Sequence, residues 1–565
     1  MRSRSHRVWL RRVLILVLVV GIGLRFANLD RKIYWHDEVY TSMRAAGFTR
    51  YEIDQNLFRN RFIPAPNLQW YQQPKFNSTL AETIYSLAIE DPQHPPLYFL
   101  LARFWMLAFG SSIGVSRVLP ALLSLLGLPL MYALVMELFG SPFTALLATT
   151  FLAISPFDIL FAQTNRQYSL LTSVVIGSSW LLLRAIRKPT WWNWGLYTLS
   201  MAIGLYTHPF FVLTIAAQGV YVLLMSGEVA RKRVAAKDVD LAVKRRFSPI
   251  LLARLRFLLQ FGMAILEALI LYSPWLAVML VNRERALATT DWARAAVDPV
   301  YLLKLWTLSF TSLFIDLDFG FDNPVTFLLR LPFLLLLAGA IYVLCRTTPR
   351  RAWLFVVLSI AVPFLLLAIP DFMSGGKRSA VSRYLISCYP GIQIAVAYLL
   401  GVGLVGKAWH WRRILLQKSQ RMNYQIKSWS DRRVWLGVLA TVFTASLISG
   451  GVSAMAKTWW DKDLSYQNAE VIEIVNKEAQ NSSPVLVSDI GDDYTNTGDL
   501  ISLSYGLQDK VRLYTVERPA DLEPLTNEDN VILFRPSNAL RTAIKDKGWV
   551  LQPFYTKAKL WQVKR

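Results

Sequence analysis

The feature that most constrains this chain is a series of apolar runs, most of them close to 20 residues long. A bilayer core is about 30 Å thick and a helix rises about 1.5 Å per residue, so a span needs about 20 apolar residues. Eleven runs in the 565-residue chain approach this length: 8–28, 118–139, 143–162, 169–187, 193–207, 209–226, 257–280, 325–345, 352–370, 384–406 and 434–456. We therefore expect a mostly α, polytopic membrane protein with about eleven transmembrane helices.

Composition supports this interpretation. Hydrophobic residues make up 54% of the chain and charged residues 18%, whereas soluble domains have about 45–50% and roughly 25%. These values exclude a string of soluble domains and a disordered chain. The net charge of +23 marks cytoplasmic loops in an apolar chain, so it need not indicate nucleic acid. With Cys345 and Cys388 as the only cysteines, a disulfide framework or a cysteine-ligated metal cluster is excluded.

The run Leu97–Phe109 decides which segments share a side of the membrane. It has 13 residues and contains Arg103, and a run of about 10–14 residues favours an interfacial or re-entrant helix. With this run in the interface, the basic segments fall on one side, which the positive-inside rule makes cytoplasmic. They are the N-terminus, 140–142, 188–192, 227–256, 346–351 and 407–433. The opposite, extracytoplasmic side receives 29–117, 163–168, 207–208, 281–324, 371–383 and the tail from 457.

Two domains follow from this topology. Residues 1–456 form a transmembrane domain whose first extracytoplasmic loop, 29–117, is long enough to be functional. Residues 457–565 change in composition, and four short runs rich in β-formers alternate there with helical patterns at 466–480 and 538–547. The four runs are 485–488, 511–516, 531–534 and 549–554. We expect a small extracytoplasmic α/β domain.

Two motifs of the first loop could carry chemistry. Asp37 and Glu38 lie among aromatics just outside the first span, where a carboxylate can act as a general base. Two acids in a solvated first helical turn would give the same pattern. His94 precedes Pro95 and Pro96, at a helix N-terminus that can bind an anion. A turn with an incidental histidine is the alternative.

Three other outer segments carry ionisable or polar groups. Asp158 is costly inside an apolar run unless it is paired, and Arg166 is its candidate partner or a phosphate ligand, with Tyr168 beside it. His208 stands at an outer turn, where it could hold an anion or a metal or cap the turn. The outer loop 371–383 runs into a span and holds further cations that suit phosphate. This group consists of Lys377, Arg378 and Arg383, followed by Tyr384. Headgroup anchoring is the alternative for these cations.

All of these segments fall on the same outer face. Together they offer a base and an anion clamp on the side away from cytoplasmic nucleotides. The sequence contains no Walker loop, zinc helix motif or dinucleotide fingerprint. Chemistry on that side needs an activated donor that crosses the membrane, and a lipid-linked phosphate has this property.

At these positions the chain resembles the GT-C glycosyltransferases, in particular the protein O-mannosyltransferase and aminoarabinose transferase branch. The resemblance covers about residues 8–400. It rests on the motifs Asp37-Glu38, His94-Pro95-Pro96-Leu97-Tyr98, Ser155-Pro156 with Gln163, Arg166-Gln167-Tyr168-Ser169-Leu170, Tyr206-Thr207-His208 and Arg383-Tyr384-Leu385. It implies a polytopic enzyme that uses a polyprenyl-phosphate sugar. One departure is Gln163-Thr164-Asn165-Arg166, where the relatives carry an acidic residue. A metal-dependent or acid-assisted step there is in doubt unless Asp158 substitutes.

Roles follow from the resemblance by motif. Asp37 would activate or orient the acceptor hydroxyl and Glu38 would support it. Arg166 and Tyr168 would line the donor or acceptor pocket, and His94 and His208 would contact the donor. Lys377 and Arg378 are candidates from their chemistry alone, whereas Arg383 is also supported by the motif.

The expected function is transfer of a sugar from a polyprenyl-phosphate donor to a lipid, glycan or protein acceptor, with inversion. We expect a multi-pass protein of the plasma membrane with its site outside the cytoplasm. No cofactor is required by the sequence, and a role for a divalent metal stays open. The alternative is a transporter or flippase for an anionic lipid or lipid-linked glycan. That alternative predicts ionisable residues near span midpoints and inverted repeats.

Overall fold

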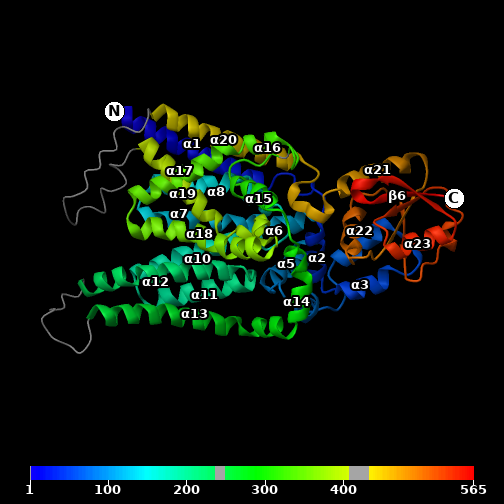
Figure 1. The fold of residues 1–565 in the computed structure, drawn as a ribbon, viewed down its shortest axis with the longest axis horizontal. Helices are drawn as coiled ribbons and strands as arrows, with labels where there is room; N and C mark the ends of the chain where they lie inside the picture. Colours follow the sequence, from blue (N-terminus) through cyan, green and yellow to red (C-terminus); the bar gives the residue numbers. More distant parts are fainter. Residues whose placement is uncertain (1, 236–248, 318, 406–431) are drawn as a thin grey trace.

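The apolar runs of the sequence form the long helices of a bundle, and a smaller domain with a β-sheet is attached to one end of it (Figure 1). The structure is a computed structural model that describes residues 2–235, 249–317, 319–405 and 432–565. The bundle contains α1 (Arg2–Arg25), α6 (Ile113–Leu125), α7 (Gly127–Phe139), α8 (Pro142–Ile154), α9 (Pro156–Ala162), α10 (Tyr168–Arg187), α11 (Trp191–Thr207), α12 (Phe211–Ala235), α13 (Pro249–Val281), α17 (Leu331–Thr347), α18 (Arg350–Ser374), α19 (Tyr389–Val405) and α20 (Arg432–Met455).

Within the described residues, seven helical segments are long and apolar enough to cross a membrane. They are 113–139, 168–187, 211–235, 249–281, 324–347, 350–374 and 432–465. The pair α8 and α9, bent by 55°, makes an eighth if it counts as one broken span. These segments identify an integral membrane protein. The other expected spans are α1, which carries Arg11 and Arg12, and α11 and α19, which have 17 residues each. The number eleven therefore stays a prediction.

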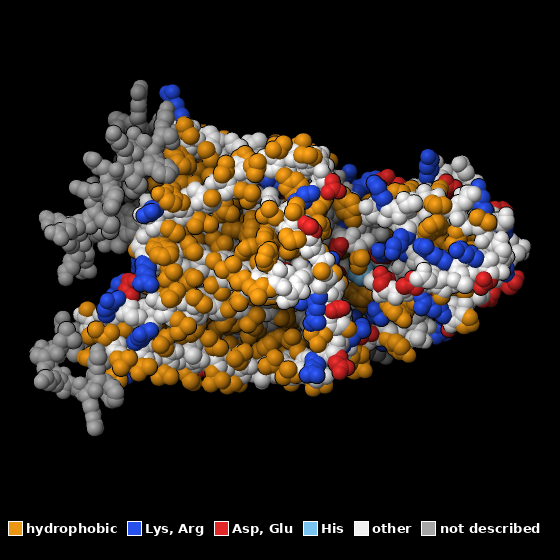
Figure 2. Space-filling view, viewed as in Figure 1, with side chains coloured by type: hydrophobic (Ala, Val, Ile, Leu, Met, Phe, Trp, Pro, Cys, Tyr) orange, Lys and Arg blue, Asp and Glu red, His pale blue; other side chains and the backbone are white. Residues whose placement is uncertain are grey.

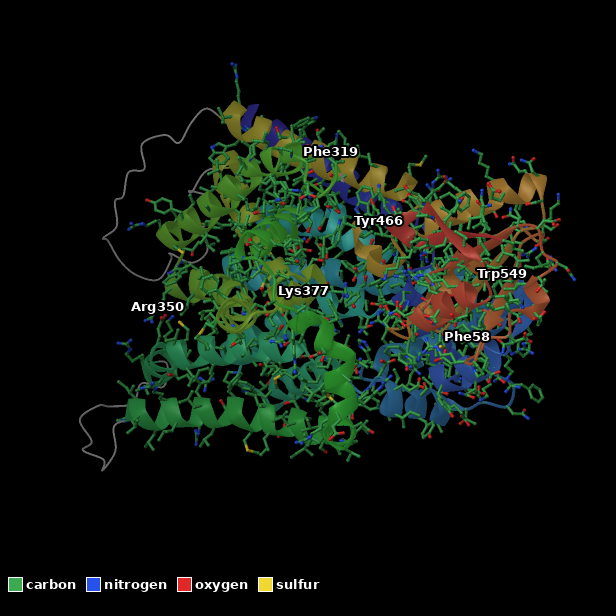
Figure 3. All side chains as sticks on the ribbon, turned by 45° about the vertical axis from the view of Figure 1, so that its right-hand side comes forward. Phe58, Phe319, Arg350, Lys377, Tyr466 and Trp549 are labelled. Carbon is green, nitrogen blue, oxygen red and sulfur yellow. The ribbon has the colours of Figure 1, made fainter. Side chains whose placement is uncertain are left out.

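Charged side chains gather at the two ends of the bundle. Hydrophobic side chains cover the middle of the visible face, and charged ones gather at its ends (Figure 2). Arg350, at the start of α18, lies at the end where the N-terminus lies, and Phe58 and Trp549 lie in the domain at the other end (Figure 3). Most of the basic residues in 227–256 and 407–433 lie outside the described residues, because 236–248 and 406–431 are not described.

The first loop is built from short elements. They are α2 (His36–Ala46), α3 (Arg50–Leu57), β1 (Arg61–Pro64), the 3₁₀ helix η1 (Ala65–Gln72), α4 (Leu80–Glu90) and α5 (Leu97–Phe109). As expected, α5 has 13 residues, which gives about 20 Å of helix, less than the roughly 30 Å of a hydrocarbon core. It packs against α2 and α6.

The outer segment between α13 and α17 is also helical. It contains α14 (Arg283–Thr290), the 3₁₀ turn η2 (Asp291–Arg294), α15 (Pro299–Thr311) and α16 (Pro324–Leu328). Two further 3₁₀ turns, η3 (Arg378–Ala380) and η4 (Ser382–Leu385), join α18 to α19. Among these, η3 packs against both α15 and α18.

The tail forms most of a six-stranded sheet in the order β1-β3-β2-β4-β6-β5. Its strands are β2 (Val485–Asp489), β3 (Arg512–Val516), β4 (Val531–Phe534), β5 (Val550–Tyr555) and β6 (Leu560–Lys564). Strand β2 is parallel to β3 and β4, and β6 is antiparallel to β4 and β5. The tail helices are the 3₁₀ helix η6 (Trp460–Ser465), α21 (Asn468–Asn481), α22 (Asn496–Ser504) and α23 (Asn538–Asp546).

One strand of this sheet comes from the first loop. Strand β1 pairs antiparallel with β3, with Arg61 opposite Thr515 and Pro64 opposite Arg512. The expected domain 457–565 therefore holds five of the six strands. Side chains on one face of the sheet join α21, α22 and the first-loop helices in one core, and those on the other face pack with α23.

The tail and the first loop also pack closely through α22. A Cβ added to Gly498 would lie 2.6 Å from Nδ1 of His36 and 2.7 Å from the Tyr40 ring. Thr497 donates a hydrogen bond to the Asp54 carboxylate. The tail is therefore seated directly on α2, the helix that carries Asp37.

Candidate functional site

Asp37 lies in the first turn of α2, whose N-cap is Trp35. Its side chain keeps 28% exposure, so it remains accessible to a ligand. The Arg166 guanidinium Nη2 lies 3.8 Å from Asp37 Oδ2. Arg166 also donates to Thr41 Oγ1 over 3.0 Å. Because Thr41 is one turn along α2, Arg166 holds the start of this helix as well as its carboxylate.

Arg166 belongs to a short loop between α9 and α10. Its guanidinium lies over the Tyr168 ring at 5.8 Å and 3.4 Å from His94 Nε2. The Gln167 side-chain nitrogen lies 3.4 Å from His94 Nδ1. The loop thus joins the start of α2 to the His94 turn before α5, as the expected topology requires.

Arg383 approaches the same carboxylate from the loop before α19. Its guanidinium lies 5.2 Å from the Trp35 ring, 5.7 Å from the Tyr384 ring and 5.9 Å from the Trp292 ring. It is close enough to Asp37 to lower the pKa of that carboxyl. Stacked guanidiniums keep their N–H groups free for an anion at the ring edge. Asp37 is thus flanked by two arginines from segments far apart in the sequence.

The protonation states follow from this setting. Burial raises the pKa of Asp37, but Arg166, Arg383 and the histidines outweigh it, so the pKa is lowered and the carboxylate is ionised. Burial, with Arg166 next, lowers the pKa of His94 to about 4. Burial also lowers the pKa of His208, with help from His94 and the arginines. Both imidazoles are therefore neutral near pH 7.

His208 completes the cluster from the turn between α11 and α12. Its ring centroid lies 6.4 Å from that of His94, 6.2 Å from Tyr168 and 6.4 Å from Tyr384. Its Nδ1 accepts the backbone N–H of Phe210, so Nε2 carries the proton of the neutral ring. The structure thus brings together Asp37, His94, Arg166, Tyr168, His208, Arg383 and Tyr384. Their individual roles stay predictions.

Glu38 lies in a separate, fully buried cluster. It accepts hydrogen bonds from Arg117 Nε and Nη2, from Lys462 Nζ, and from the backbone N–H groups of Trp35 and Asn165. Burial raises the pKa of Glu38, but Arg117 and Lys462 outweigh burial and bring this pKa down to about 2. With its oxygens fully engaged, Glu38 has no lone pair left for a substrate. These contacts hold the start of α2, so we assign Glu38 to positioning this helix, and its supporting role in catalysis stays a prediction.

Asp158 differs from the expectation in its partner. Its Oδ2 accepts a hydrogen bond from Gln393 on α19 over 2.8 Å, inside the bundle. Of the two alternatives for Arg166, the pairing with Asp158 is wrong, because Arg166 pairs with Asp37.

The two basic candidates before α19 differ in placement. Lys377 Nζ lies 5.3 Å from the Trp292 ring, the same ring that Arg383 approaches, so Lys377 borders the site. Arg378 is half-buried on η3, and in the described part of the chain no recorded hydrogen bond or ion pair links it to Asp37.

Three residues of the two clusters belong to none of the sequence motifs: Trp292, Arg117 and Lys462. Trp292 lies in the segment 281–324, and its aromatic side chain was the only feature in the sequence that could have indicated a place in the site. Arg117 and Lys462 are 79 and 424 residues from Glu38, and no local pattern indicates such pairs.

Metal binding finds no support in the side chains. Within the described ranges, no group of three or more His, Cys, Asp or Glu side chains is arranged to hold a metal ion. His94 and His208 each face a guanidinium-rich cluster, which disfavours a cation.

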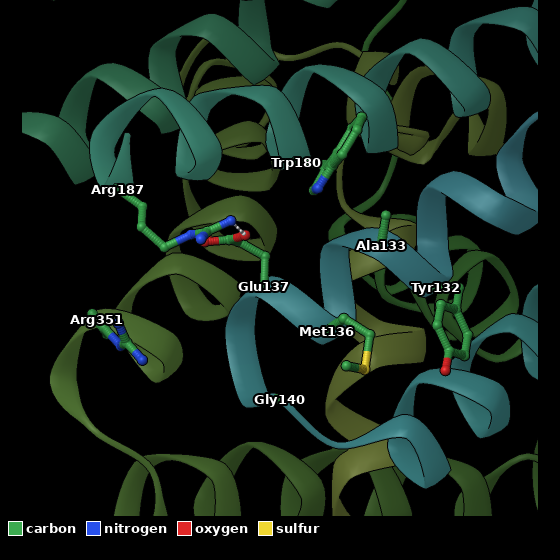
Figure 4. A pocket seen from close by; sticks show the side chains of 8 residues that line it. All are labelled: Tyr132, Ala133, Met136, Glu137, Gly140, Trp180, Arg187 and Arg351. Atoms are coloured by element: carbon green, nitrogen blue, oxygen red, sulfur yellow. Dashed lines mark hydrogen bonds and ion pairs between the residues drawn. The ribbon is translucent and has the colours of Figure 1, made fainter. Parts of the chain in front are cut away.

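A cavity of about 510 Å³ lies at the other end of the bundle, between α7, α10 and α18 (Figure 4). Glu137 and Arg187 form an ion pair across it, with Trp180 and Arg351 nearby (Figure 4). Its only carboxylate is already paired with Arg187, so this cavity does not offer the base and anion clamp found around Asp37.

Comparisons with known proteins were made for sequence and structure. A search of curated protein sequences returned no match. The solved structures with similarity include ArnT from Cupriavidus metallidurans bound to undecaprenyl phosphate (16% identity, 97% of each chain covered, TM-score 0.49). They also include oligosaccharyltransferase AglB from Archaeoglobus fulgidus in complex with an inhibitory peptide and a dolichol-phosphate (13% identity, 92% of this chain and 69% of that chain, TM-score 0.43).

A family model matches part of the sequence. The matched residues are 93–251, and the family is described as dolichyl-phosphate-mannose-protein mannosyltransferase. This segment holds His94, Arg166, Tyr168 and His208 of the site. The chain is therefore similar to this family over that segment, and its resemblance to the GT-C glycosyltransferases is confirmed.

Proposed function

We propose that the chain is a membrane glycosyltransferase that moves a sugar from a polyprenyl-phosphate donor to an acceptor hydroxyl. The observation that carries this proposal is an ionised Asp37 flanked by the Arg166 and Arg383 guanidiniums. A phosphate between the two arginines would put the anomeric carbon near a carboxylate that accepts the acceptor's proton. The family match over residues 93–251 supports the same reaction class.

The reaction is a single displacement. The acceptor oxygen bonds to the anomeric carbon as the bond from that carbon to the phosphate oxygen breaks. The hydroxyl proton passes to Asp37, and the lipid phosphate leaves with the electron pair. The leaving group is already anionic and needs charge neutralisation, which guanidiniums aimed at the phosphate supply. The configuration at the anomeric carbon inverts.

Donor binding also adjusts the base. In the free site, Arg166 and Arg383 lower the pKa of Asp37, which makes it a weak base. A phosphate between the arginines adds negative charge beside Asp37 and offsets this effect. The carboxylate becomes a better proton acceptor when donor is present, which couples the base to the complex.

The site's place in the bundle bears on the alternative function. Its charged residues lie at the end that carries the tail domain (Figure 1), whereas a transporter holds its site near the bilayer midplane. By the positive-inside rule, the end opposite Arg350 faces outward. We therefore place the reaction outside the cytoplasm, at the plasma membrane, with a lipid, glycan or protein acceptor.

The test uses the full chain in lipid nanodiscs with radiolabelled polyprenyl-phosphate sugars of several hexoses and pentoses. We expect transfer or slow hydrolysis from at least one donor, and a loss of about 10²–10⁴-fold in Asp37→Asn at unchanged thermal stability. Glu473→Gln is a control, because Glu473 forms an exposed pair with Lys457 in the tail. Turnover by Asp37→Asn at the wild-type rate would show that Asp37 is not the proton acceptor.

A further inference from the structure

A second cavity, of about 580 Å³, lies between β1 and η1 of the first loop. Its floor includes Leu57 and Leu68, and its rim includes the exposed Trp70. Leu57 is the neighbour of Phe58, which Figure 3 places in the domain beyond the bundle. The volume is within the usual range for small-ligand sites, about 300–1,000 Å³.

The 3₁₀ geometry of η1 builds one wall of this cavity. Side chains three residues apart eclipse in a 3₁₀ helix, which rises about 2 Å per residue. Pro64, Asn67, Trp70 and Gln73 follow this spacing, and all four are exposed and line the cavity. Ala65 and Leu68, on another face of the same helix, are buried. The result is a ridge on which the Asn67 carboxamide precedes the Trp70 indole by about 6 Å along the axis, and the Gln73 carboxamide follows at the C-cap.

The chemistry of this ridge suits a neutral sugar. The indole of Trp70 is 59% exposed although it belongs to a well-packed element. An indole face packs against the apolar face of a sugar ring, and carboxamides both donate to and accept from hydroxyls. Among the residues that line the cavity, Arg61 is the only charged one. Arg61 donates a hydrogen bond to the backbone oxygen of Asn56, and the lining offers no second cation to clamp an anion, so a neutral polyhydroxyl ligand fits it.

A peptide added to the sheet edge fits less well. Strand β1 is the edge strand, and it has four residues and ends at Pro64. A proline lacks the N–H that a further strand needs, and short edge strands with proline resist strand addition. The open edge therefore offers a partner little main-chain hydrogen bonding.

The cavity is separate from the reaction site. Tyr71 of η1 packs edge-to-face on Phe48, just past the end of α2, at 5.5 Å between centroids. Asp37 stands at the other end of that helix, which has 11 residues and so is about 16 Å long. A ligand in this cavity does not touch Asp37 unless it is a chain of several units.

We propose that the cavity formed by β1 and η1 binds a neutral oligosaccharide, stacked on Trp70 between the carboxamides of Asn67 and Gln73. The binding of an oligosaccharide here does not depend on the proposed sugar transfer. Its use, to hold a glycan acceptor near α2, rests on the proposed function.

The test measures binding to the full chain in lipid nanodiscs prepared without sugar detergents, because their headgroups would compete. The probes are linear hexasaccharides of mannose, glucose, galactose or N-acetylglucosamine. Their binding is measured by saturation-transfer NMR and calorimetry. We expect at least one to bind, and Trp70→Ala to weaken it at least tenfold. Trp70→Phe should retain most of the affinity, and Asn67→Ala or Gln73→Ala should weaken it severalfold.

Phe76→Ala is the matched control, because Phe76 is 82% exposed in the same loop and does not line the cavity. It should bind like the wild type, as should Asp37→Asn. Binding that survives in Asp37→Asn while donor turnover is lost separates this proposal from the proposed function. Absence of binding by all four probes, equal binding by Trp70→Ala, or displacement of the sugar by a proline-rich peptide would overturn the proposal.

Discussion

Replacing Glu38 by glutamine tests whether the buried cluster holds α2 in place. The charges of Arg117 and Lys462 and the N–H groups of Trp35 and Asn165 stay behind when the carboxylate is removed. Breaking a buried pair from one side costs about 3–5 kcal/mol. The fall of the Glu38 pKa from its ordinary 4.5 to about 2 gives a similar scale, roughly 3.5 kcal/mol at about 1.4 kcal/mol per unit.

Thermal unfolding in nanodiscs, followed by tryptophan fluorescence, measures this loss. We expect a clear drop in Tm for Glu38→Gln, and little change for Glu473→Gln, since an exposed pair is worth about 0–1 kcal/mol. Turnover per folded molecule is measured in parallel. If Glu38→Gln unfolds like the wild type and loses turnover alone, then Glu38 acts in catalysis and our assignment to positioning is wrong.

The same residue predicts a pH dependence of stability. Because the folded pKa of Glu38 is depressed, its contribution is complete above its ordinary pKa of 4.5 and is lost as the pH falls towards about 2. The gap in Tm between the wild type and Glu38→Gln should therefore be full at pH 6 and narrow on acidification through pH 4 to pH 3. A gap that stays constant over this range would contradict the buried charge.

Three further predictions concern the site and its support. Arg166→Gln should slow transfer about 10²–10³-fold and raise the pKa of Asp37, so the acid limb of the pH–rate profile should move to higher pH; an unmoved limb would refute the pairing. Since the pKa of His94 lies at about 4, the rate should show no limb from a histidine between pH 5 and pH 8, and a limb near 6.5 would show that a histidine titrates in the reaction. Gly498→Val should separate the tail from α2, because a Cβ there meets the His36 ring at 2.6 Å; limited proteolysis of the tail should become faster than in Gly437→Val, whose Cβ meets open space.

The bundle and the gathering of the site could be predicted because they follow from local patterns. Apolar runs fix the helices, and the short run Leu97–Phe109 fixes which loops share an end. That choice placed Asp37 and Arg166 together, and they lie 3.8 Å apart. All four of the expected strands in the tail coincide with β2, β3, β4 and β5 to within a residue at each end.

The remaining features depend on contacts that no local pattern encodes. Glu38 and Asp37 are adjacent in the sequence, so the local pattern does not distinguish them. Glu38 nevertheless faces Arg117 and Lys462, because the turn of α2 directs it into the protein interior. The sequence of η1 predicts a loop. The ridge becomes apparent only from the three-residue spacing of a 3₁₀ helix and from the packing of η1 on α22. Strand β1 is four residues long and becomes a strand because β3 is beside it.

The pairing of β1 with β3 has a consequence for biosynthesis. Strand β1 emerges from the ribosome before the second apolar run, and its partner only after the last membrane crossing. Lys462, which neutralises Glu38, is made equally late. A product truncated before Lys462 would therefore leave Glu38 without one of its two cationic partners, and α2 reaches its final packing only after the last membrane-spanning segment has been made.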